Sequence, residues 1–312
     1  MSDKRGILVV GSINMDLVVR ATEMPAPGQT VMGESFKTLP GGKGANQAVA
    51  VARLGGQCRL IGRIGDDAFG QTLLADLQSE GVDCRNVLAT SAASGVAMIV
   101  VNASGENAIV VASGANSLLT PDDIFSRADL FSDCAIVLLQ LELPQPTVRA
   151  AMDVARRNGC KIILDPAPAP RNMPKELYDV DIISPNVIEA ERLTGKGAIE
   201  ERVAKLVASE LVARGAKSAV MKLGSRGSLV VMADGHFYTV PAYNVSVVDT
   251  TGAGDAFTGA LAVALADGQN LHAAARFANA AGALACTRLG AQSAMPTAAE
   301  VRILMENQPT AG

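Results

Sequence analysis

Residues 247–257, VVDTTGAGDAF, place small residues and carboxylates where an apolar strand gives way to a helix. Glycine this close to a helix start costs conformational entropy and adds no packing. Small residues there do let backbone N–H groups point at an anion, which the helix dipole also favours. Asp255 would then lie within reach of the attacking group, where a carboxylate can accept a proton from a substrate hydroxyl. The stretch predicts a phosphate-facing turn with a general base, and a strand-to-helix turn capped by the aspartate is the alternative interpretation.

A second polar turn, GGKGAN at residues 41–46, opens another predicted helix. Its glycines let backbone amides approach a ligand closely, while Lys43 and Asn46 supply hydrogen-bond donors. GSINMD ends the first predicted strand, and its Asn14 and Asp16 are two residues apart, so both side chains can project the same way. A carboxylate accepts hydrogen bonds from vicinal hydroxyls, and amide and ammonium groups donate to them. The two motifs together predict recognition of a polyol; for either motif alone, a solvated polar turn is the alternative.

Two common nucleotide-binding motifs do not occur in the chain. There is no GxxxxGK(S/T) sequence, so the phosphate-facing turn is not a Walker A loop. The spacing from Gly252 and Gly254 to Gly259 does not match the GxGxxG fingerprint of dinucleotide-binding domains. Recognition of a phosphate must therefore use a different arrangement.

Composition restricts the class of protein. The chain has 312 residues, 49% hydrophobic and 19% charged, which fits one large α/β domain with an appendage. The formal net charge is −4 and no basic run occurs, so we expect no nucleic-acid partner. Five scattered cysteines without a CxxC motif predict free thiols in a reducing compartment, and two histidines are too few for a zinc cluster. The first apolar run is too short for a signal peptide and no segment approaches about 18 apolar residues, so we expect a cytoplasmic protein that does not cross a membrane.

Strand-like and helix-like segments alternate along the chain. The nearly continuous apolar runs predict strands covered on both faces, at residues 7–13, 58–65, 135–142, 161–166 and 218–224. Segments with helical periodicity lie between them, including residues 44–56, 66–81 and 145–159. This alternation predicts a mainly parallel sheet with right-handed crossovers.

Two regions, residues 17–38 and 95–112, are instead typical of paired short strands. Their alternation indicates half-buried strands, so we expect a small separate sheet that covers an active site or pairs with another subunit. Met98, in the second region, is expected in the core. The segment PAPAPRNMP at 166–174 follows a predicted strand whose end should face the ligand cleft, and we interpret it as an active-site loop.

With these motifs, the chain resembles the ribokinase family of carbohydrate kinases (the PfkB group). GGKGAN-x-A begins the first signature of that family and DTTGAGD is its second. Other segments look like family segments in the expected order, among them PGQTV, GDDAFG, QLELP, DPAPA, SPNVIEAERLTG, KLGSRG and TRLGAQ. The resemblance covers essentially the whole chain. It implies one catalytic domain, residues 1–312, with a three-layer α/β/α architecture, a mainly parallel central sheet and a small β-sheet lid formed by about 15–40 and 95–112.

The resemblance also implies roles for individual residues. The catalytic residues are the general base and the amides of an anion hole, namely Asp255, Gly252, Ala253 and Gly254. The sugar is expected to contact Asn14, Asp16, Gly42, Lys43, Gly44, Asn46, Glu142 and Asp255. The residues expected along ATP and its Mg²⁺, where an N-x-x-E pair acts through water, are Asn186, Glu189, Lys222, Gly224, Ser225, Gly227, Gly254 and Asn279.

Members of the family bind an activating monovalent cation, usually K⁺, beside the anion hole. The implied site consists of Asp249, Thr251, Ala285, Arg288 and Gly290. The family often continues with GAQPS where this chain has GAQSA, residues 290–294. If that serine is a ligand, its replacement by Ala294 puts one contact in doubt, although Ser293 is adjacent.

The function implied is ATP-dependent phosphorylation of D-ribose at O5, which gives D-ribose 5-phosphate and ADP, in a homodimer joined through the lid. The nearest rival is a kinase for another small sugar such as 2-deoxyribose. Kinases of that type tend to carry methionine where this chain has Asn14, which offers a partner to the 2-hydroxyl and so favours ribose. A rival from another class is a non-catalytic sugar or nucleotide sensor, which the intact Asp255 and glycine turn do not support.

Overall fold

The predicted apolar runs become the strands of a large sheet in the computed structural model of the protein, which describes residues 6–197 and 200–308. In sheet order the strands are β13 (Phe237–Val240), β12 (Ser228–Met232), β11 (Ser218–Lys222), β10 (Ile182–Ile183), β9 (Lys161–Leu164), β8 (Cys134–Leu139), β1 (Gly6–Val10), β4 (Cys58–Gly65) and β5 (Asp83–Thr90). All neighbours from β11 to β5 pair in parallel, and only the β11–β12 and β12–β13 pairs are antiparallel. The prediction of a mainly parallel sheet is confirmed.

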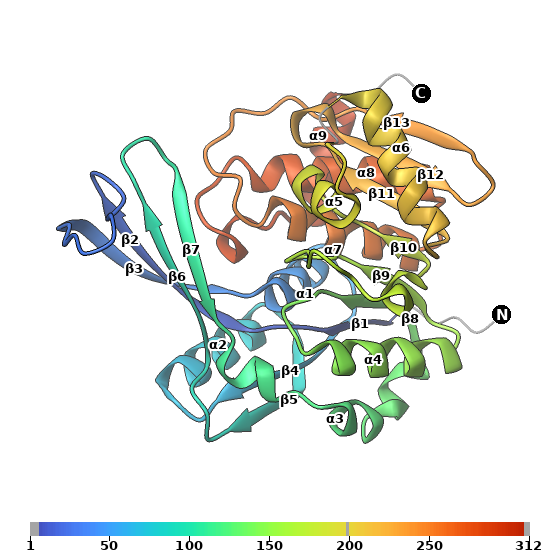
Figure 1. Ribbon diagram of the computed structural model, residues 1–312. Coiled ribbons are helices and arrows are strands. Elements are labelled where there is room, and N and C mark those ends of the chain that lie inside the picture. The colour runs from blue at the N-terminus through green and yellow to red at the C-terminus, as the bar shows by residue number, and fades with distance from the viewer. Residues whose placement is uncertain (1–5, 198–199, 309–312) are drawn as a thin grey trace.

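Helices cover both faces of this sheet, because successive strand residues point to opposite sides. In β1, Ile7 and Val9 pack into one apolar cluster, while Leu8 and Val10 pack into the other. The first cluster includes residues of α1 (Lys43–Arg53), α2 (Ala68–Ser79), α7 (Ala253–Ala266), α8 (Leu271–Ala285) and α9 (Ala298–Asn307). The second includes residues of α3 (Pro121–Phe125), α4 (Gln145–Arg157), α5 (Val187–Thr194) and α6 (Glu201–Ala213). The result is the expected three-layer α/β/α body (Figure 1).

A second, smaller sheet projects from one side of this body (Figure 1). Its order is β3 (Gly33–Gly41), β2 (Asn14–Ala21), β6 (Gly95–Val101) and β7 (Asn107–Ala112). The β2–β3 and β6–β7 pairs are antiparallel, as expected for two hairpins, and β2 and β6 join them in parallel. The small separate sheet predicted from the alternation is therefore present.

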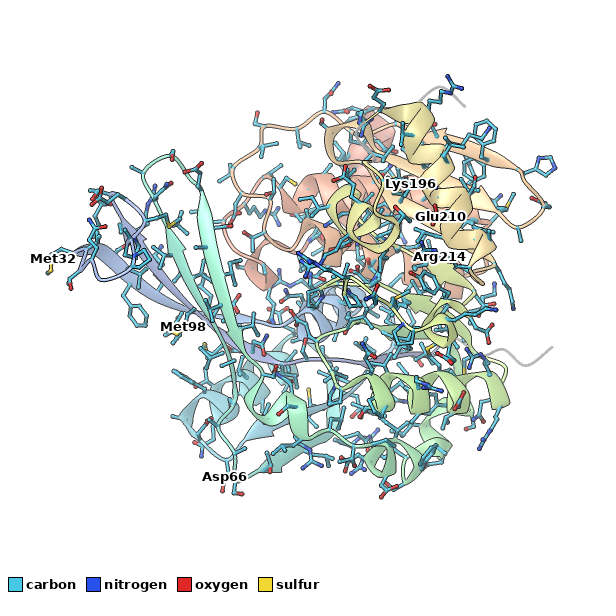
Figure 2. All side chains as sticks on the ribbon, in the orientation of Figure 1. Met32, Asp66, Met98, Lys196, Glu210 and Arg214 are labelled. Carbon is cyan, nitrogen blue, oxygen red and sulfur yellow. The ribbon has the colours of Figure 1, made fainter. Side chains whose placement is uncertain are left out.

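The two faces of the small sheet carry different side chains, polar ones near the site on one face and apolar ones on the other. Paired residues share a face, so the registers place Leu17, Met98 and Val110 together on the face opposite to Asn14 and Asp16. Met98 is 60% exposed, so its assignment to the core was wrong. It lies in a sheet that is covered on neither side along its outer half, and it points away from the part of the molecule that holds α7 and α8 (Figure 2).

Four predicted strand ends differ from the structure. The runs 161–166 and 218–224 end as strands at Leu164 and Lys222. The run 7–13 ends as a strand at Val10, and the run 135–142 ends at Leu139. In both places the chain leaves the sheet at its carboxyl edge. Asn14 and Asp16 accordingly do not end the first strand but begin β2.

The carboxyl edge of the large sheet has a topological switch point at β1. Its neighbours are β4 on one side and β8 on the other, so the connections diverge there and leave a crevice. The GSI turn, residues 11–13, leads from β1 into this crevice. The fold thus opens a ligand site where the predicted polar motifs lie.

No helix within residues 6–197 and 200–308 is long and apolar enough to cross a membrane. The single domain predicted for residues 1–312 also includes 1–5, 198–199 and 309–312, which lie outside the described residues.

Candidate active site

The predicted base, Asp255, lies in the first turn of α7 and is 5% exposed. α7 begins at Gly252, whose φ of 75° is in the left-handed region, and an added Cβ there would lie 2.9 Å from the Cα of Ala291. No side chain caps this helix. The glycine in this turn is therefore required both by backbone conformation and by the lack of space for a side chain.

The N–H groups of the turn are only partly engaged. Ala253 donates its N–H to the carbonyl of Thr250 at 3.2 Å, so this predicted member of the anion hole already has a local partner. Within the described part of the chain, the N–H groups of Gly252 and Gly254 have no protein acceptor. Free N–H groups at a helix N-terminus are suited to bind an anion.

The Asp255 carboxylate accepts a hydrogen bond on each oxygen. Asn46 Nδ2 donates to Oδ2 at 2.9 Å, and Gln47 Nε2 donates to Oδ1 at 3.1 Å. Burial raises the pKa of Asp255 above its usual range, and the charge of Asp165 raises it too, whereas Lys43 and the two amides lower it. The Asp255 carboxylate is shielded from water and held in one orientation, so it can accept a proton from a fixed direction.

Two glycine turns hold the predicted sugar residues together. An added Cβ on Gly44 would lie 2.5 Å from the Cα of Gly11, and one on Gly42 would lie 2.7 Å from the backbone nitrogen of Asn14. Ala45 also donates its N–H to the Ser12 carbonyl at 2.9 Å. The GGKGAN and GSINMD motifs are therefore in direct backbone contact, which the sequence alone did not establish.

The predicted acid Glu142 belongs to the same cluster. Its Oε2 accepts a hydrogen bond from Ser12 Oγ at 2.5 Å and from the N–H of Lys43 at 3.1 Å. Burial raises the pKa of Asp16 to about 7, and the charges of Glu142 and Asp255 contribute to this rise. Burial lowers the pKa of Lys43, but the negative charges of the surrounding carboxylates together raise it by more. The pKa is therefore above its usual value, and this ammonium stays charged.

Some ligand-binding atoms of this cluster are left without protein partners. Asn116 Nδ2 donates to Asn14 Oδ1 at 2.7 Å, which leaves Asn14 Nδ2 to donate to a ligand. Asn46 uses its Nδ2 on Asp255, and its Oδ1 has no partner within the described residues. Together with Asp16, these atoms supply both donors and acceptors, as a polyol requires.

A cavity of about 610 Å³ extends from Asp255 and residues 252–254. All residues predicted along ATP line it, namely Asn186, Glu189, Lys222, Gly224, Ser225, Gly227, Gly254 and Asn279. Lys43 and Asp165 also line it. Strand ends and helix starts from distant parts of the sequence thus meet at one hollow of a size suited to a nucleotide.

The contacts of several of these residues refine their predicted roles. Asn186 and Glu189 form a reciprocal capping box at the start of α5, with Asn186 N–H donating to Glu189 Oε2 at 2.7 Å. Asn279 donates its Nδ2 to the carbonyls of Val240 and Pro241, so it also anchors the loop after β13. Lys222 Nζ donates to Asp165 Oδ1 at 3.1 Å.

The predicted cation loop is folded around Asp249. Its Oδ1 accepts from the N–H and hydroxyl of Thr251, and its Oδ2 accepts from Gly290 N–H at 2.9 Å. Burial raises the pKa of Asp249, but these hydrogen bonds lower it more, so the carboxylate is ionised. Ser293 Oγ donates its proton to the Leu289 carbonyl at 2.7 Å.

The carbonyls predicted for the cation lie next to this loop but have different contacts. Arg288 donates its N–H to the Ala285 carbonyl at 3.5 Å, and its guanidinium pairs with Glu300. The described ranges contain no group of three or more His, Cys, Asp and Glu side chains that could hold a metal ion.

Four buried polar residues at the site were missed from the sequence. They are Gln47, Asn116, Gln140 and Asp165, each at most 1% exposed. Gln140 and Asp165 directly follow buried parallel strands, and Gln47 interrupts an otherwise apolar helix face. A polar residue at either kind of position is the signal that could have identified these three, whereas Asn116 lies in a short 3₁₀ helix, Gly114–Leu118, where neither signal applies.

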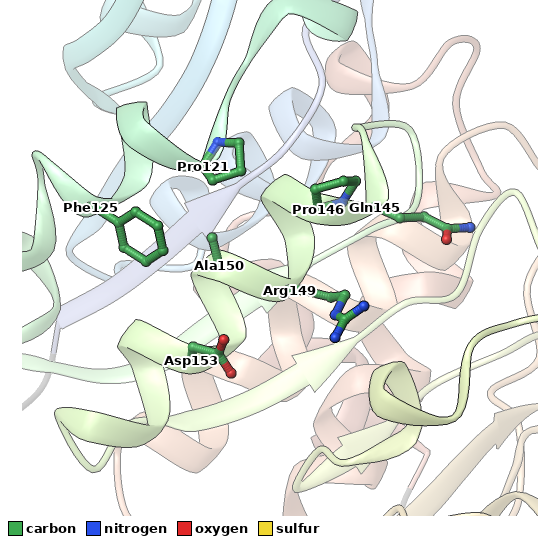
Figure 3. Close-up of a pocket in the computed structure, with 7 residues that line it drawn as sticks. All are labelled: Pro121, Phe125, Gln145, Pro146, Arg149, Ala150 and Asp153. Carbon is green, nitrogen blue, oxygen red and sulfur yellow. The ribbon is translucent and has the colours of Figure 1, made fainter.

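A second hollow of about 330 Å³ lies elsewhere, between α3 and α4 (Figure 3). Phe125 and Arg149 are among the side chains around it. None of the predicted site residues lines it, so it is separate from the cavity at Asp255.

Comparison with known proteins agrees with this geometry. Residues 4–298 match the pfkB family of carbohydrate kinases. The chain is 41% identical to the ribokinase of Bacillus subtilis over 96% of its own length and 99% of the relative's. It is 36% identical to the deoxyribokinase of Salmonella typhimurium over 93% of this chain and 95% of that one.

A solved structure supports the same relation. The ribokinase of Arabidopsis thaliana, complexed with ribose and ATP, superposes with a TM-score of 0.89 at 33% identity, covering 98% of this chain and 99% of the other. The family match over nearly the whole chain and the shared fold lead to one conclusion. The chain belongs to the pfkB family of carbohydrate kinases.

Proposed function

We propose that the protein transfers the γ-phosphoryl group of ATP to O5 of D-ribose, with Asp255 as general base. The observation that carries this proposal is the position of the Asp255 carboxylate. It is hydrogen-bonded to Asn46 in the polyol cluster and lines the cavity that begins at the free N–H groups of Gly252 and Gly254. A hydroxyl held by the first group and a phosphoryl group held by the second would meet beside this carboxylate.

The reaction then follows from positioning and electrostatics. Asp255 accepts the proton of the O5 hydroxyl as the oxygen attacks phosphorus, and the bond to the leaving ADP oxygen breaks in line. The N–H groups of Gly252 and Gly254 stabilise the charge on the transferring group. Lys43 offsets the negative charge that gathers at the site.

Mg²⁺ prefers oxygen ligands and keeps several waters, and it commonly binds through one or two carboxylates together with substrate phosphates. The carboxylates of Glu189 and Asp165 line the cavity and fit this requirement. Asn186 and Glu189 would hold the ion through water, and the bound ion would neutralise phosphate charge.

Ribose is preferred over 2-deoxyribose in this proposal because of Asn14. Its Nδ2 has no acceptor among residues 6–197 and 200–308, while its Oδ1 is fixed by Asn116. A buried polar group left unpaired by a deoxy substrate costs binding energy. The curated relatives include both kinds of kinase, so the sugar has to be tested on this chain.

The cysteines support the expected compartment. Cys58, Cys84 and Cys286 are free thiols. Such thiols fit a reducing compartment such as the cytoplasm.

The first prediction concerns the base. Asp255→Asn should lower kcat by about 10²- to 10⁴-fold, because the amide cannot accept the proton. The measurement is ADP release with ribose and ATP, and binding of ribose by calorimetry should persist. Asp267→Asn, at the exposed end of the same helix, is the matched control and should keep wild-type activity.

Retention of most activity by Asp255→Asn would remove Asp255 as the base. Wild-type protein that binds ribose and ATP without turnover would instead favour the sensor.

The second prediction concerns the sugar. In a panel assayed by ADP release, kcat/KM for ribose should exceed that for 2-deoxyribose by about tenfold or more, the effect of one unpaired buried group. Asn14→Met should reduce this ratio, whereas Asn107→Met on the exposed strand β7 should not. A higher kcat/KM for 2-deoxyribose in the wild type would assign the chain to the rival activity.

The third prediction concerns the cation loop. We propose that K⁺ binds beside Asp249 and stabilises the adjacent turn. Replacing tetramethylammonium by K⁺ at constant ionic strength should raise kcat about tenfold. This effect is smaller than the loss of kcat on removing a complete anion-hole donor, because the cation only stabilises the turn that carries the donors. Asp249→Asn should weaken the response, because it weakens the contacts to Thr251 and Gly290. A flat response in the wild type would mean that the GAQSA segment has lost the site.

The fourth prediction concerns the small sheet, which we propose as a lid over the sugar and as a homodimer interface. Phe36, Met98 and Val110 share the face away from Asn14 and are 61%, 60% and 69% exposed. Contiguous exposed apolar side chains often mark an interface. In sedimentation the wild type should be a dimer and Met98→Lys should shift toward monomer, while Lys37→Ala on the other face should not. A wild-type monomer at micromolar concentration would exclude this interface.

A further inference from the structure

Gln47 is a buried polar residue that the predicted site did not include. It is 0% exposed, lies in the first turns of α1, and does not line the cavity at Asp255. Its Nε2 donates to Asp255 Oδ1 at 3.1 Å and to Asp165 Oδ2 at 3.0 Å. A single amide nitrogen therefore joins the proposed base to a second buried carboxylate.

The orientation of this amide is fixed by chemistry. Ionised carboxylates only accept hydrogen bonds, so both of them require the NH₂ side of Gln47. Its Oε1 then accepts from Gln140 Nε2 at 2.7 Å. Gln140 Oε1 has no partner among the described residues, and an added Cβ on Gly11 would lie 2.2 Å from it. The chain of amides is thus directional, and it ends on the two carboxylates.

The second carboxylate extends this chain into the nucleotide cavity. Asp165 Oδ1 accepts from Lys222 Nζ at 3.1 Å, and both side chains are nearly buried, with exposed fractions of 2% and 11%. An added Cβ on Gly254 would lie 3.5 Å from Lys222 Nζ, so this ammonium lies beside the phosphate-facing turn. Gln47 therefore connects the proton acceptor to a cation that faces the phosphates.

We propose that Gln47 is a positioning residue for phosphoryl transfer, which fixes the Asp255 carboxylate and ties it through Asp165 to Lys222. The inference rests on the proposed function for its assay. Asn46 and Gln47 hold one oxygen of Asp255 each, so the carboxylate cannot rotate without breaking one of these hydrogen bonds. Gln47 places a hydrogen-bond donor between Asp255 and Asp165, and this donor offsets the repulsion between the two carboxylates.

The Gln47 amide and the Asp165 carboxylate have opposite effects on the pKa of the proposed base, Asp255. The amide of Gln47 favours the ionised form of Asp255 and so lowers its pKa, whereas the negative charge of Asp165 raises it. The charged groups that surround this pair from the other elements are Lys43 on α1, Asp16 on β2, Glu142 after β8, Glu189 on α5 and Lys222 on β11.

The test compares variants by steady-state kinetics and pH profile. Gln47→Met keeps an unbranched side chain of similar length and removes both donors. It should lower kcat by about 10²-fold, the scale expected for a misplaced catalytic group, with KM for ribose and ATP within about threefold, because Gln47 does not line the cavity. The acidic limb of kcat/KM should move to higher pH, since the lost amide no longer favours the ionised base.

Two further variants separate positioning from packing. Gln140→Met removes the partner of Gln47 Oε1 but leaves the amide between its carboxylates, so it should lower the melting temperature and change kcat by less than about threefold. Asp165→Asn removes the repelling charge, so its acidic limb should move to lower pH, opposite to Gln47→Met. Gln47→Glu keeps the side-chain volume and should move the acidic limb of kcat/KM to higher pH. This variant replaces Gln47→Met in the comparison if Gln47→Met does not fold.

Equal losses of kcat in Gln47→Met and Gln140→Met would overturn the proposal, because they would show a packing effect. Wild-type kcat in Gln47→Met, or limbs that move in the same direction in Gln47→Met and Asp165→Asn, would overturn it as well. If another sugar proves to be the substrate, the proposed function fails, and the same comparisons on that sugar still decide the role of Gln47. A wild type without turnover on any sugar would overturn both.

Discussion

The active site depends on a backbone contact that only glycine permits. Gly11 and Gly44 lie so close that a Cβ added to Gly44 would be 2.5 Å from the Cα of Gly11. This contact presses the start of α1 against the turn after β1 and brings the two polyol motifs together. A Cβ on Gly259 in α7 would likewise lie 2.7 Å from the Cβ of Ala50 in α1. Both approaches are needed for Asn46 to reach Asp255, and a shift of about 1 Å at a catalytic group can cost about 10²-fold in rate.

The second constraint is electrostatic, because the site gathers carboxylates away from water. Burial raises the pKa of Asp16 to about 7 from 3.8 and raises that of Asp255. The folded state therefore binds more protons than the unfolded state between these values. The stability that Asp16 contributes is fully present below pH 3.8 and is lost as the pH rises through about 7. The contribution of Asp255 is lost in the same direction. The charge of Lys43 limits this cost at Asp255. Groups needed for function therefore reduce stability at the same site.

The sequence allowed the architecture to be predicted because its signals were local and strong. Apolar runs covered on both faces predicted the parallel sheet, and the alternation in 95–112 predicted a separate small one. Met98 was misassigned because alternation does not tell which face of an uncovered sheet meets solvent. Gln47 and Asp165 were missed for another reason. Local patterns could mark each of them as a buried polar residue, but not that the two are in contact across 118 positions of the sequence.

Helix starts show how the same sequence separates stability from function. Side chains accept hydrogen bonds from first-turn N–H groups at the starts of α2, α3, α5, α8 and α9, from Asp67, Thr120, Asn186, Asn270 and Thr297. Such a cap stabilises a helix by about 1 kcal/mol. α1 and α7 instead begin on Gly42 and Gly252, with φ of 88° and 75° and no side-chain cap.

α4 and α6 also lack a side-chain cap, but they begin on Pro144 and Glu200 rather than on a left-handed glycine. A capping side chain at α7 would occupy the N–H groups that a phosphoryl group needs, and at α1 it would collide with the turn after β1. The two helices that form the site therefore begin without a cap from the side chain of their own N-cap residue. At α7 the N–H group of Gly254 stays available, whereas at α1 the N–H groups of Lys43 and Gly44 donate to Glu142 Oε2 and Ser12 Oγ. The nearby amides of Asn46 and Gln47 orient the base.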